Sequence, residues 1–296
     1  MSGSSVLFDI PGPRARFRYH LATAATVAVI AFVAWVVYSK LDTAGQLTAE
    51  KWEPFVTGNL WTTYVLPGIL GTLKAAGLSI VLALILGLLL GVGRMSAHPA
   101  ISWFCAVFVE LFRAIPVLIL MIFAYFAYSK YDVFPSEYAT LAGVVTGLTL
   151  YNGAVIAEIV RAGVNALPRG QSEAASSLGL RWGQTMRSIL LPQAITSMLP
   201  VLVSQLVVVL KDTAIGVAIT YLELVGAAQN IGASYSNYIP ALMVIAAIYI
   251  TVNFALSSLA TWLEGYLRRS RRGPEPVHVT AATQDTLGAG TAGGTV

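Results

Sequence analysis

The sequence has very little charge. Of its 296 residues, 11% are Asp, Glu, Lys or Arg and 56% are hydrophobic, whereas about 25% of the residues of an ordinary soluble domain are charged. So few charged side chains cannot cover the surface of a soluble protein of this length, and the lipid bilayer must be its main solvent. The composition therefore predicts a protein embedded in a membrane.

Cysteine and histidine are also scarce, and their scarcity excludes several kinds of site. The single cysteine, Cys105, lies within an apolar run, so there is neither a disulfide framework nor a thiolate metal site. Three histidines and the absence of a Gly-Lys-Ser/Thr phosphate loop predict no metal site, no catalytic centre and no cofactor bound by this chain. The net charge of +4 does not indicate nucleic-acid binding, because the basic residues sit at the ends of apolar runs rather than on one face.

Six apolar stretches are long enough to cross a bilayer, which takes about 20 residues in a helix. They are residues 21–39, 66–93, 101–128, 138–161, 189–210 and 239–263. The first follows three arginines but is longer than the apolar core of a signal peptide and has no clear cleavage signature, so we expect it to be retained. The chain is thus predicted to be all-α, with about six transmembrane helices.

A seventh candidate, residues 213–231, is decided by charge. With six spans and an internal N-terminus, twelve arginines face the cytoplasm and only three lysines, Lys40, Lys51 and Lys130, face outside, as the positive-inside rule requires. The twelve are Arg14, Arg16, Arg18, Arg94, Arg161, Arg169, Arg181, Arg187, Arg268, Arg269, Arg271 and Arg272. A seventh span would expel the cluster Arg268–Arg272, so we expect 213–231 to be a re-entrant or lying segment buried in protein. Both termini are predicted to be cytoplasmic.

These spans imply a division of the chain into five parts. They are a cytoplasmic segment 1–20, an extra transmembrane helix 21–39, an extracytoplasmic loop 40–65, a core domain 66–265, and a basic, disordered cytoplasmic tail 266–296.

The cytoplasmic loop between the fourth and fifth spans contains a predicted short helix. Ser172 is a candidate N-cap, Glu173 stands in the first turn where the helix dipole favours an acid, and Ala174 and Ala175 give a small, flat face. Gly179 can end the helix in a left-handed conformation. A short helix between two breaks is typical of a docking element, although an ordinary interhelical loop explains these residues equally well.

The order of residues in this loop resembles a known pattern. Glu173-Ala174-Ala175, then Gly179, then residues 189–192 match the EAA loop of binding-protein-dependent ABC importer permeases. Further matches narrow the resemblance to the polar amino acid permeases, loosely to the actinobacterial glutamate type. They are residues 109–113, 151–153, 157–163, 167–171 and 210–213.

The resemblance implies a fold, a function and partners. The fold would be a type I ABC importer transmembrane domain with a cytoplasmic coupling helix, and the cargo a polar amino acid, with glutamate as a first guess. The ATPase-coupling residues would be Gly170, Gln171, Glu173, Ala174, Ala175 and Gly179. The implied partners are two ATP-binding subunits that carry ATP and Mg²⁺, a second permease subunit, identical or related, and an extracytoplasmic amino-acid-binding protein. Ser172 departs from the family, which usually has a bulky aromatic there, and the family core has five spans rather than six.

Charged and amide side chains inside the spans are candidates for the substrate path, because burial in a membrane makes them costly. Glu110 with Arg113, and Glu158 with Arg161, are three residues apart on one helix face and can equally be self-satisfied structural pairs. Lys211 and Asp212 stand where the fifth span ends in a break. A zwitterion needs a cationic or N–H site and an acceptor, and we expect them from Asn152, Gln205, Lys211 and Asp212.

Two other classes of protein compete with this interpretation. An ion-coupled secondary transporter would be favoured by inverted internal repeats, of which we see none, and it leaves the EAA pattern unexplained. A membrane scaffold without transport would need neither the charge pairs nor a docking helix.

Overall fold

The computed structural model describes residues 12–269, all of whose regular elements are helical. The described residues divide into two compact units. The first unit contains the described residues up to Gly77, residues 121–145 and residues 212–250. The second contains residues 78–120, residues 146–211 and the described residues from Thr251 onward. Most of the predicted tail, including Arg271 and Arg272, lies outside the described residues.

Long apolar helices account for most of the predicted spans. Five helices of the described chain are long and apolar enough to cross a membrane, or six if a bent pair counts as one span. The main helices of these five spans are α1 (Pro13–Thr43), α4 (Leu66–Arg94), α7 (Ser136–Asn165), α10 (Leu191–Asp212) and α12 (Tyr238–Arg269). None of the residues of α1 is buried, as expected of a helix whose apolar side chains face lipid.

The third predicted span is not one straight helix. It consists of α5 (Pro99–Ala114) and α6 (Val117–Lys130), bent by 100° at the break between them. Ile115 is extended there, with φ −88° and ψ 129°. Pro116 explains the break, because proline has no N–H to donate and forces the residue before it out of the helical region. The continuous apolar run 101–128 concealed this interruption.

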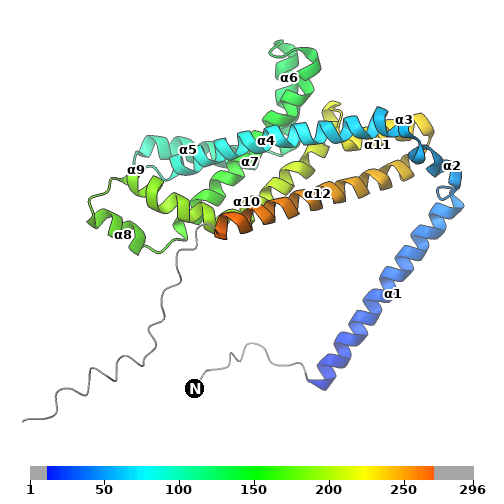
Figure 1. Cartoon of the computed structure of the whole chain (residues 1–296), viewed down its shortest axis with the longest axis horizontal. Helices are drawn as coiled ribbons and strands as arrows, with labels where there is room; N and C mark the ends of the chain where they lie inside the picture. Colours follow the sequence, from blue (N-terminus) through cyan, green and yellow to red (C-terminus); the bar gives the residue numbers. More distant parts are fainter. Residues whose placement is uncertain (1–11, 270–296) are drawn as a thin grey trace, which may run out of the picture. The chain divides into compact units, whose positions relative to one another are not determined.

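Residues 213–231 do not form a span, as predicted. They form a 3₁₀ helix, η4 (Thr213–Ile219), and part of α11 (Leu224–Tyr235), separated by a break that begins at Thr220 with φ +61°. The 12 residues of α11 are too few to cross the hydrocarbon core. Half of them are buried, and they pack against η2 (Trp61–Val65) and α12 in the core of the first unit (Figure 1).

The polar stretch before α4 folds onto the same core. It contains α2 (Ala49–Trp52), the 3₁₀ helix η1 (Glu53–Val56), α3 (Gly58–Leu60) and the π-helix η2. Lys51 Nζ donates to the carbonyl of Ser236 at 2.7 Å, and Asn237 Nδ2 donates to the carbonyl of Lys51 at 3.1 Å. Phe55 packs in the buried cluster. This stretch is therefore tied to the turn between α11 and α12.

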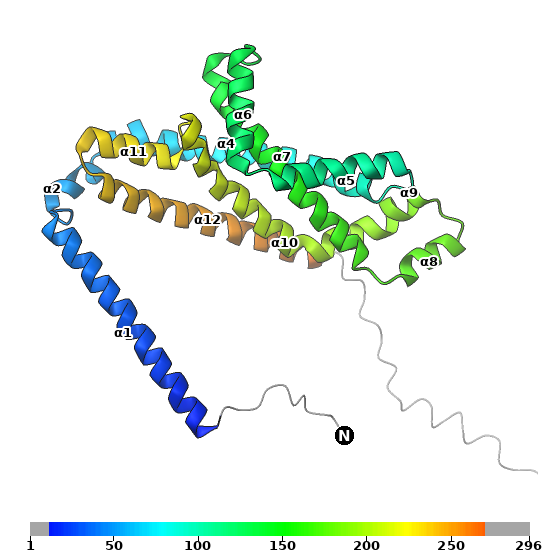
Figure 2. The ribbon, with the colours of Figure 1, turned by 180° about the vertical axis from the view of Figure 1, so that it is seen from behind.

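The second unit is built around α7. Its buried side chains Ala154, Ile156, Ala157 and Val160 contact the later half of α4, and Val109 joins them from α5. The loop after α7 contains α8 (Gly170–Ser177), α9 (Trp182–Thr185) and the π-helix η3 (Met186–Leu190), which leads into α10 (Figure 2).

The fit between α4 and the break in the 213–231 segment yields a stability prediction. A Cβ atom added at Gly71 would lie 2.1 Å from the carbonyl oxygen of Leu222, whereas one added at Gly77 of the same helix meets nothing within 4 Å. We expect Gly71→Ala to cost about 1–3 kcal/mol, because backbone must shift to admit the methyl group. Gly77→Ala is the matched control and should cost nothing. Thermal unfolding of the purified protein in detergent measures both, and equal stability of the two variants would contradict the close approach.

Candidate functional site

Helix α8 begins one turn earlier than predicted. Its first residue is Gly170, and Arg169 occupies the N-cap position without a side-chain cap bond. The predicted N-cap at Ser172 is wrong, because that residue is already helical and its hydroxyl donates back to the carbonyl of Arg169 at 2.8 Å. The amide of Gln171 closes the turn on the carbonyl of Pro168 at 3.0 Å. Glu173 stands in the first turn, as predicted.

The left-handed ending predicted for this helix is confirmed. Gly179 has φ +76°, a conformation that costs other L-residues about 1–2 kcal/mol. Its amide donates to the carbonyl of Ser176 at 2.9 Å, and the amide of Leu180 donates to the carbonyl of Ala175 at 3.1 Å. These two bonds form a Schellman motif, which satisfies the last carbonyls of the helix and turns the chain sharply towards α9.

The predicted coupling residues do not all face the same way. Glu173 and Ala174 are exposed, and so is Leu178 at 79%. Ala175 is only 1% exposed, so its side chain packs within the loop and cannot itself touch a partner. Its assignment as a direct contact is therefore corrected, since helical geometry turns one position in this short helix inward. Gly170 and Gln171 are exposed, and Gln171 Oε1 accepts a long bond of 3.4 Å from Gln193 Nε2.

An open pocket of about 370 Å³ adjoins the inner side of α8. Ser172 and Ser176 of α8 line one wall, and Asn165, Trp182 and residues of η3 line the others. Helix α8 contacts α9 and η3, the segment that leads into α10, while its outer side stays open.

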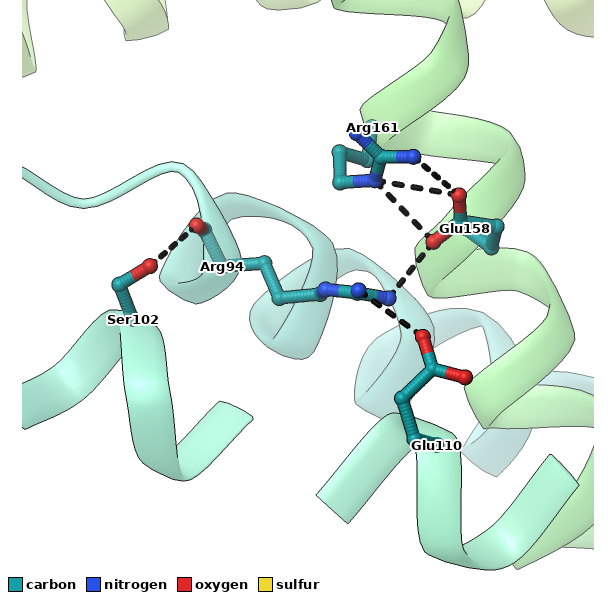
Figure 3. Close-up of polar contacts among 5 residues, drawn as sticks. All are labelled: Arg94, Ser102, Glu110, Glu158 and Arg161. Carbon is teal, nitrogen blue, oxygen red and sulfur yellow. Dashed lines mark hydrogen bonds and ion pairs between the residues drawn. The ribbon is translucent and has the colours of Figure 1, made fainter. Parts of the chain in front are cut away.

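Charged side chains of α4, α5 and α7 form an ionic cluster (Figure 3). Arg94, the last residue of α4, lies between Glu158 at 2.7 Å and Glu110 at 3.0 Å. Glu158 also accepts from Arg161, as predicted from their spacing. The carbonyl of Arg94 accepts a bond of 2.7 Å from Ser102 Oγ. One arginine therefore joins three helices.

The predicted pairing of Glu110 with Arg113 is wrong. Glu110 pairs with Arg94 instead, and Arg113 is exposed. Spacing on one helix shows which groups share a face, but Arg94 reaches Glu110 from the end of another helix. In the sequence, Arg94 stands at the end of an apolar run and before a turn, a position that indicates a cytoplasmic charge but gives no signal of its partners.

Two of the predicted substrate-path amides lie together. Gln205 Nε2 of α10 donates to Asn152 Oδ1 of α7 at 2.7 Å, and Asn152 Nδ2 donates to the carbonyl of Leu148 at 2.9 Å. Asn152 is fully buried. Lys211 and Asp212 form the end of α10, where Lys211 is exposed and Asp212 is half-buried. The 3₁₀ helix η4 continues the helix directly after this pair. The predicted break therefore lies later than expected, at Thr220, where φ is +61°.

Glu223 is a buried acid that the sequence interpretation did not assign. It is 0% exposed, and its carboxylate accepts from the amides of Val225 and Gly226 and from the hydroxyl of Tyr249. The available signal was that Glu223 is the only charged residue between Thr213 and Ile231. Its function as an N-cap of α11 explains why an acid is tolerated there.

Comparisons with known proteins agree on one class. The family described as "Binding-protein-dependent transport system inner membrane component" matches residues 79–269. The chain is 53% identical over 227 residues to the glutamate transport system permease protein GluD of Corynebacterium glutamicum, covering 77% of this chain and 83% of that protein. It is 38% identical over 200 residues to the probable glutamine ABC transporter permease protein GlnP of Bacillus subtilis, and this alignment covers 67% of this chain and 90% of that protein.

A solved structure supports the fold. The crystal structure of an amino acid ABC transporter with histidines matches with a TM-score of 0.62 and 30% identity, covering 70% of this chain and 95% of that one. The family match begins at residue 79 and so does not include the residues before it.

The ionic cluster yields a prediction about its two acids. Glu158 is 24% exposed and binds two arginines, whereas Glu110 is 61% exposed and binds one. We expect Glu158→Gln to destabilise the protein by about 2 kcal/mol, between the values typical of exposed and buried ion pairs. Glu110→Gln, the matched control, should cost about 1 kcal/mol or less. Thermal unfolding in detergent compares them, and a larger loss at Glu110 would show that Arg94 depends mainly on that acid.

Proposed function

Because the chain belongs to the family of binding-protein-dependent transport system inner membrane components, we propose that it is the multi-pass permease subunit of an ATP-driven ABC importer that takes a polar amino acid into the cell, with glutamate as the first candidate. The observation that carries the choice of substrate is the 53% identity to a glutamate transport system permease over 227 residues. The fold and the ordered helix α8 support the mechanism.

ATP binding and hydrolysis would take place on partner subunits. This chain has no phosphate loop, so two separate ATP-binding subunits would bind ATP with Mg²⁺ and hydrolyse it. A second permease subunit would complete the membrane domain, and an external binding protein would deliver the amino acid. Both termini and α8 would lie in the cytoplasm, as the distribution of arginines indicates.

Helix α8 is suited to couple this chain to an ATPase. Its outer side carries exposed Glu173, Ala174 and Leu178, while Ala175 fixes its inner side. An apolar side chain that is 79% exposed at the end of a short polar helix is a candidate anchor for a cleft on a partner. Movement of the ATPase would reach α7 and α10 through the loop on either side.

The substrate path is proposed to contain two kinds of groups. Asn152 and Gln205 offer amide donors and acceptors inside the second unit, and the end of α10 offers a cation, Lys211, beside an acid, Asp212. An amino acid with an acidic side chain needs cationic or N–H partners for its carboxylates and an acceptor for its ammonium group. The ionic cluster around Arg94 is internally paired, which favours a structural function for Glu110, Glu158 and Arg161, whereas exposed Arg113 stays a candidate.

Cross-linking tests the position of α8. In a Cys105→Ala background, a cysteine at exposed Ala174 should be captured by the ATPase in the assembled complex. A cysteine at buried Ala175 is the matched control and should be captured far less, because its side chain is enclosed. A cysteine at Glu50 should react with an impermeant thiol reagent from outside the cell and never capture the ATPase. Capture from Glu50, or equal capture from Ala174 and Ala175, would contradict the proposed arrangement.

Transport by the reconstituted complex tests the coupling. Proteoliposomes should take up labelled glutamate when ATP is supplied on the side of α8. Gly179→Val should abolish most of this uptake, because valine strongly disfavours φ +76°, while the spans stay folded. Gly183→Val is the matched control, since a Cβ at either glycine meets nothing within 4 Å and only Gly179 has a positive φ. Undiminished uptake by Gly179→Val, or uptake driven by an ion gradient without ATP, would favour a secondary transporter instead.

A further inference from the structure

A buried polar centre in the first unit is unused by the function proposed so far. Thr72 of α4, Thr213 at the start of η4 and Glu223 before α11 are all 0% exposed. They surround Tyr249 of α12, whose hydroxyl donates to Glu223 Oε2 at 2.8 Å and is also in hydrogen-bond contact with the side chains of Thr72 and Thr213. Residues of α4, of η4, of the break before α11 and of α12 therefore meet at one hydroxyl group.

The carboxylate of Glu223 is fully occupied. Oε1 accepts from the amide of Gly226 at 2.7 Å, and Oε2 accepts from the amide of Val225 at 2.9 Å as well as from Tyr249. All three partners are donors, which is the arrangement that an acceptor-only carboxylate needs. The two amides belong to the first turn of α11, where the helix dipole favours negative charge. The acid thus binds the start of α11 and α12 together.

The break between η4 and α11 is fixed to α4 as well. The amide of Leu224 donates to Thr72 Oγ1 at 3.2 Å, and the hydroxyl of Tyr221 donates to the carbonyl of Gly71 at 2.8 Å. A buried backbone amide at such a break needs a partner within the protein, and Thr72 supplies it for Leu224, while Tyr221 ties the break to the backbone of α4. Both ends of η4 are consequently held. The first residue, Thr213, is held by its contact with Tyr249, and the far end is held because residues 221–224 bond to α4.

Asp212 is the residue directly before the fixed start of η4. We propose that Glu223 and Tyr249 are positioning residues that, through Thr213, hold Asp212 in the substrate path so that it can accept hydrogen bonds from the ammonium group of the transported amino acid. This inference rests on the proposed function, since it presupposes transport of an amino acid along this path.

Tyr249→Phe removes the central hydroxyl and keeps the ring. ATP-driven glutamate uptake per assembled complex should fall at least about tenfold, as expected for loss of a hydrogen bond to a charged group, while ATP hydrolysis stimulated by the binding protein continues. The matched control is Tyr235→Phe in the same unit, whose exposed ring packs on Tyr64 and whose change should leave uptake within about twofold. Normal uptake by Tyr249→Phe would overturn the inference.

A double-mutant cycle separates positioning from simple stabilisation. If Tyr249 acts through Asp212, the variant that combines Tyr249→Phe with Asp212→Asn should transport no more slowly than Asp212→Asn alone. Multiplying losses would overturn the inference. Should Tyr249→Phe reduce assembly, Thr213→Val decides, because it breaks the same connection next to Asp212 and should reproduce the loss of uptake. Failure of wild-type uptake would contradict the proposed function. Normal wild-type uptake, together with losses of rate that multiply in the double variant, would contradict only the positioning.

Discussion

Inside a bilayer, every backbone N–H and C=O group must find its partner within the protein. A straight helix meets this requirement by itself, so the stretches that depart from straight helix determine what else the chain must provide. The break at residues 220–223 is the clearest case. Its amides and side chains bond to Gly71, Thr72 and Tyr249, and the close approach of Gly71 to Leu222 makes room for that backbone. The buried core of the first unit forms around this requirement.

The same lack of water governs the charged side chains. In the second unit, Arg94 and Arg161 together neutralise Glu158 and Glu110 at the ends of three helices. In the first unit, Glu223 is satisfied by two amides and a tyrosine hydroxyl. Each unit therefore has its own polar centre. The groups that we propose for contact with a solute lie outside these two centres, at the end of α10 and at the amide pair Asn152 and Gln205.

Outside the spans, backbone geometry replaces burial as the controlling factor. Helix α8 has few buried side chains, and it is shaped by a turn at Pro168 and by the left-handed Gly179. Ala175 is its inward contact, and the residues on either side of it face outward. A short helix that is fixed at both ends moves with the spans it connects, which is what coupling to an ATPase would require.

The sequence by itself determined the membrane class, the apolar stretches, the short span-free segment 213–231 and the left-handed turn at Gly179, because hydrophobic length, charge bias and glycine act locally. Only the tertiary structure decided which groups the charged side chains pair with. Arg94 reaches Glu158 across 64 residues of sequence and Glu110 across 16, and Glu223 finds Tyr249 across 26. It also turned Ala175 inward and bent the third span at Pro116. Spacing along one helix fixes which residues share its face, whereas the neighbour that meets that face is set by packing between helices.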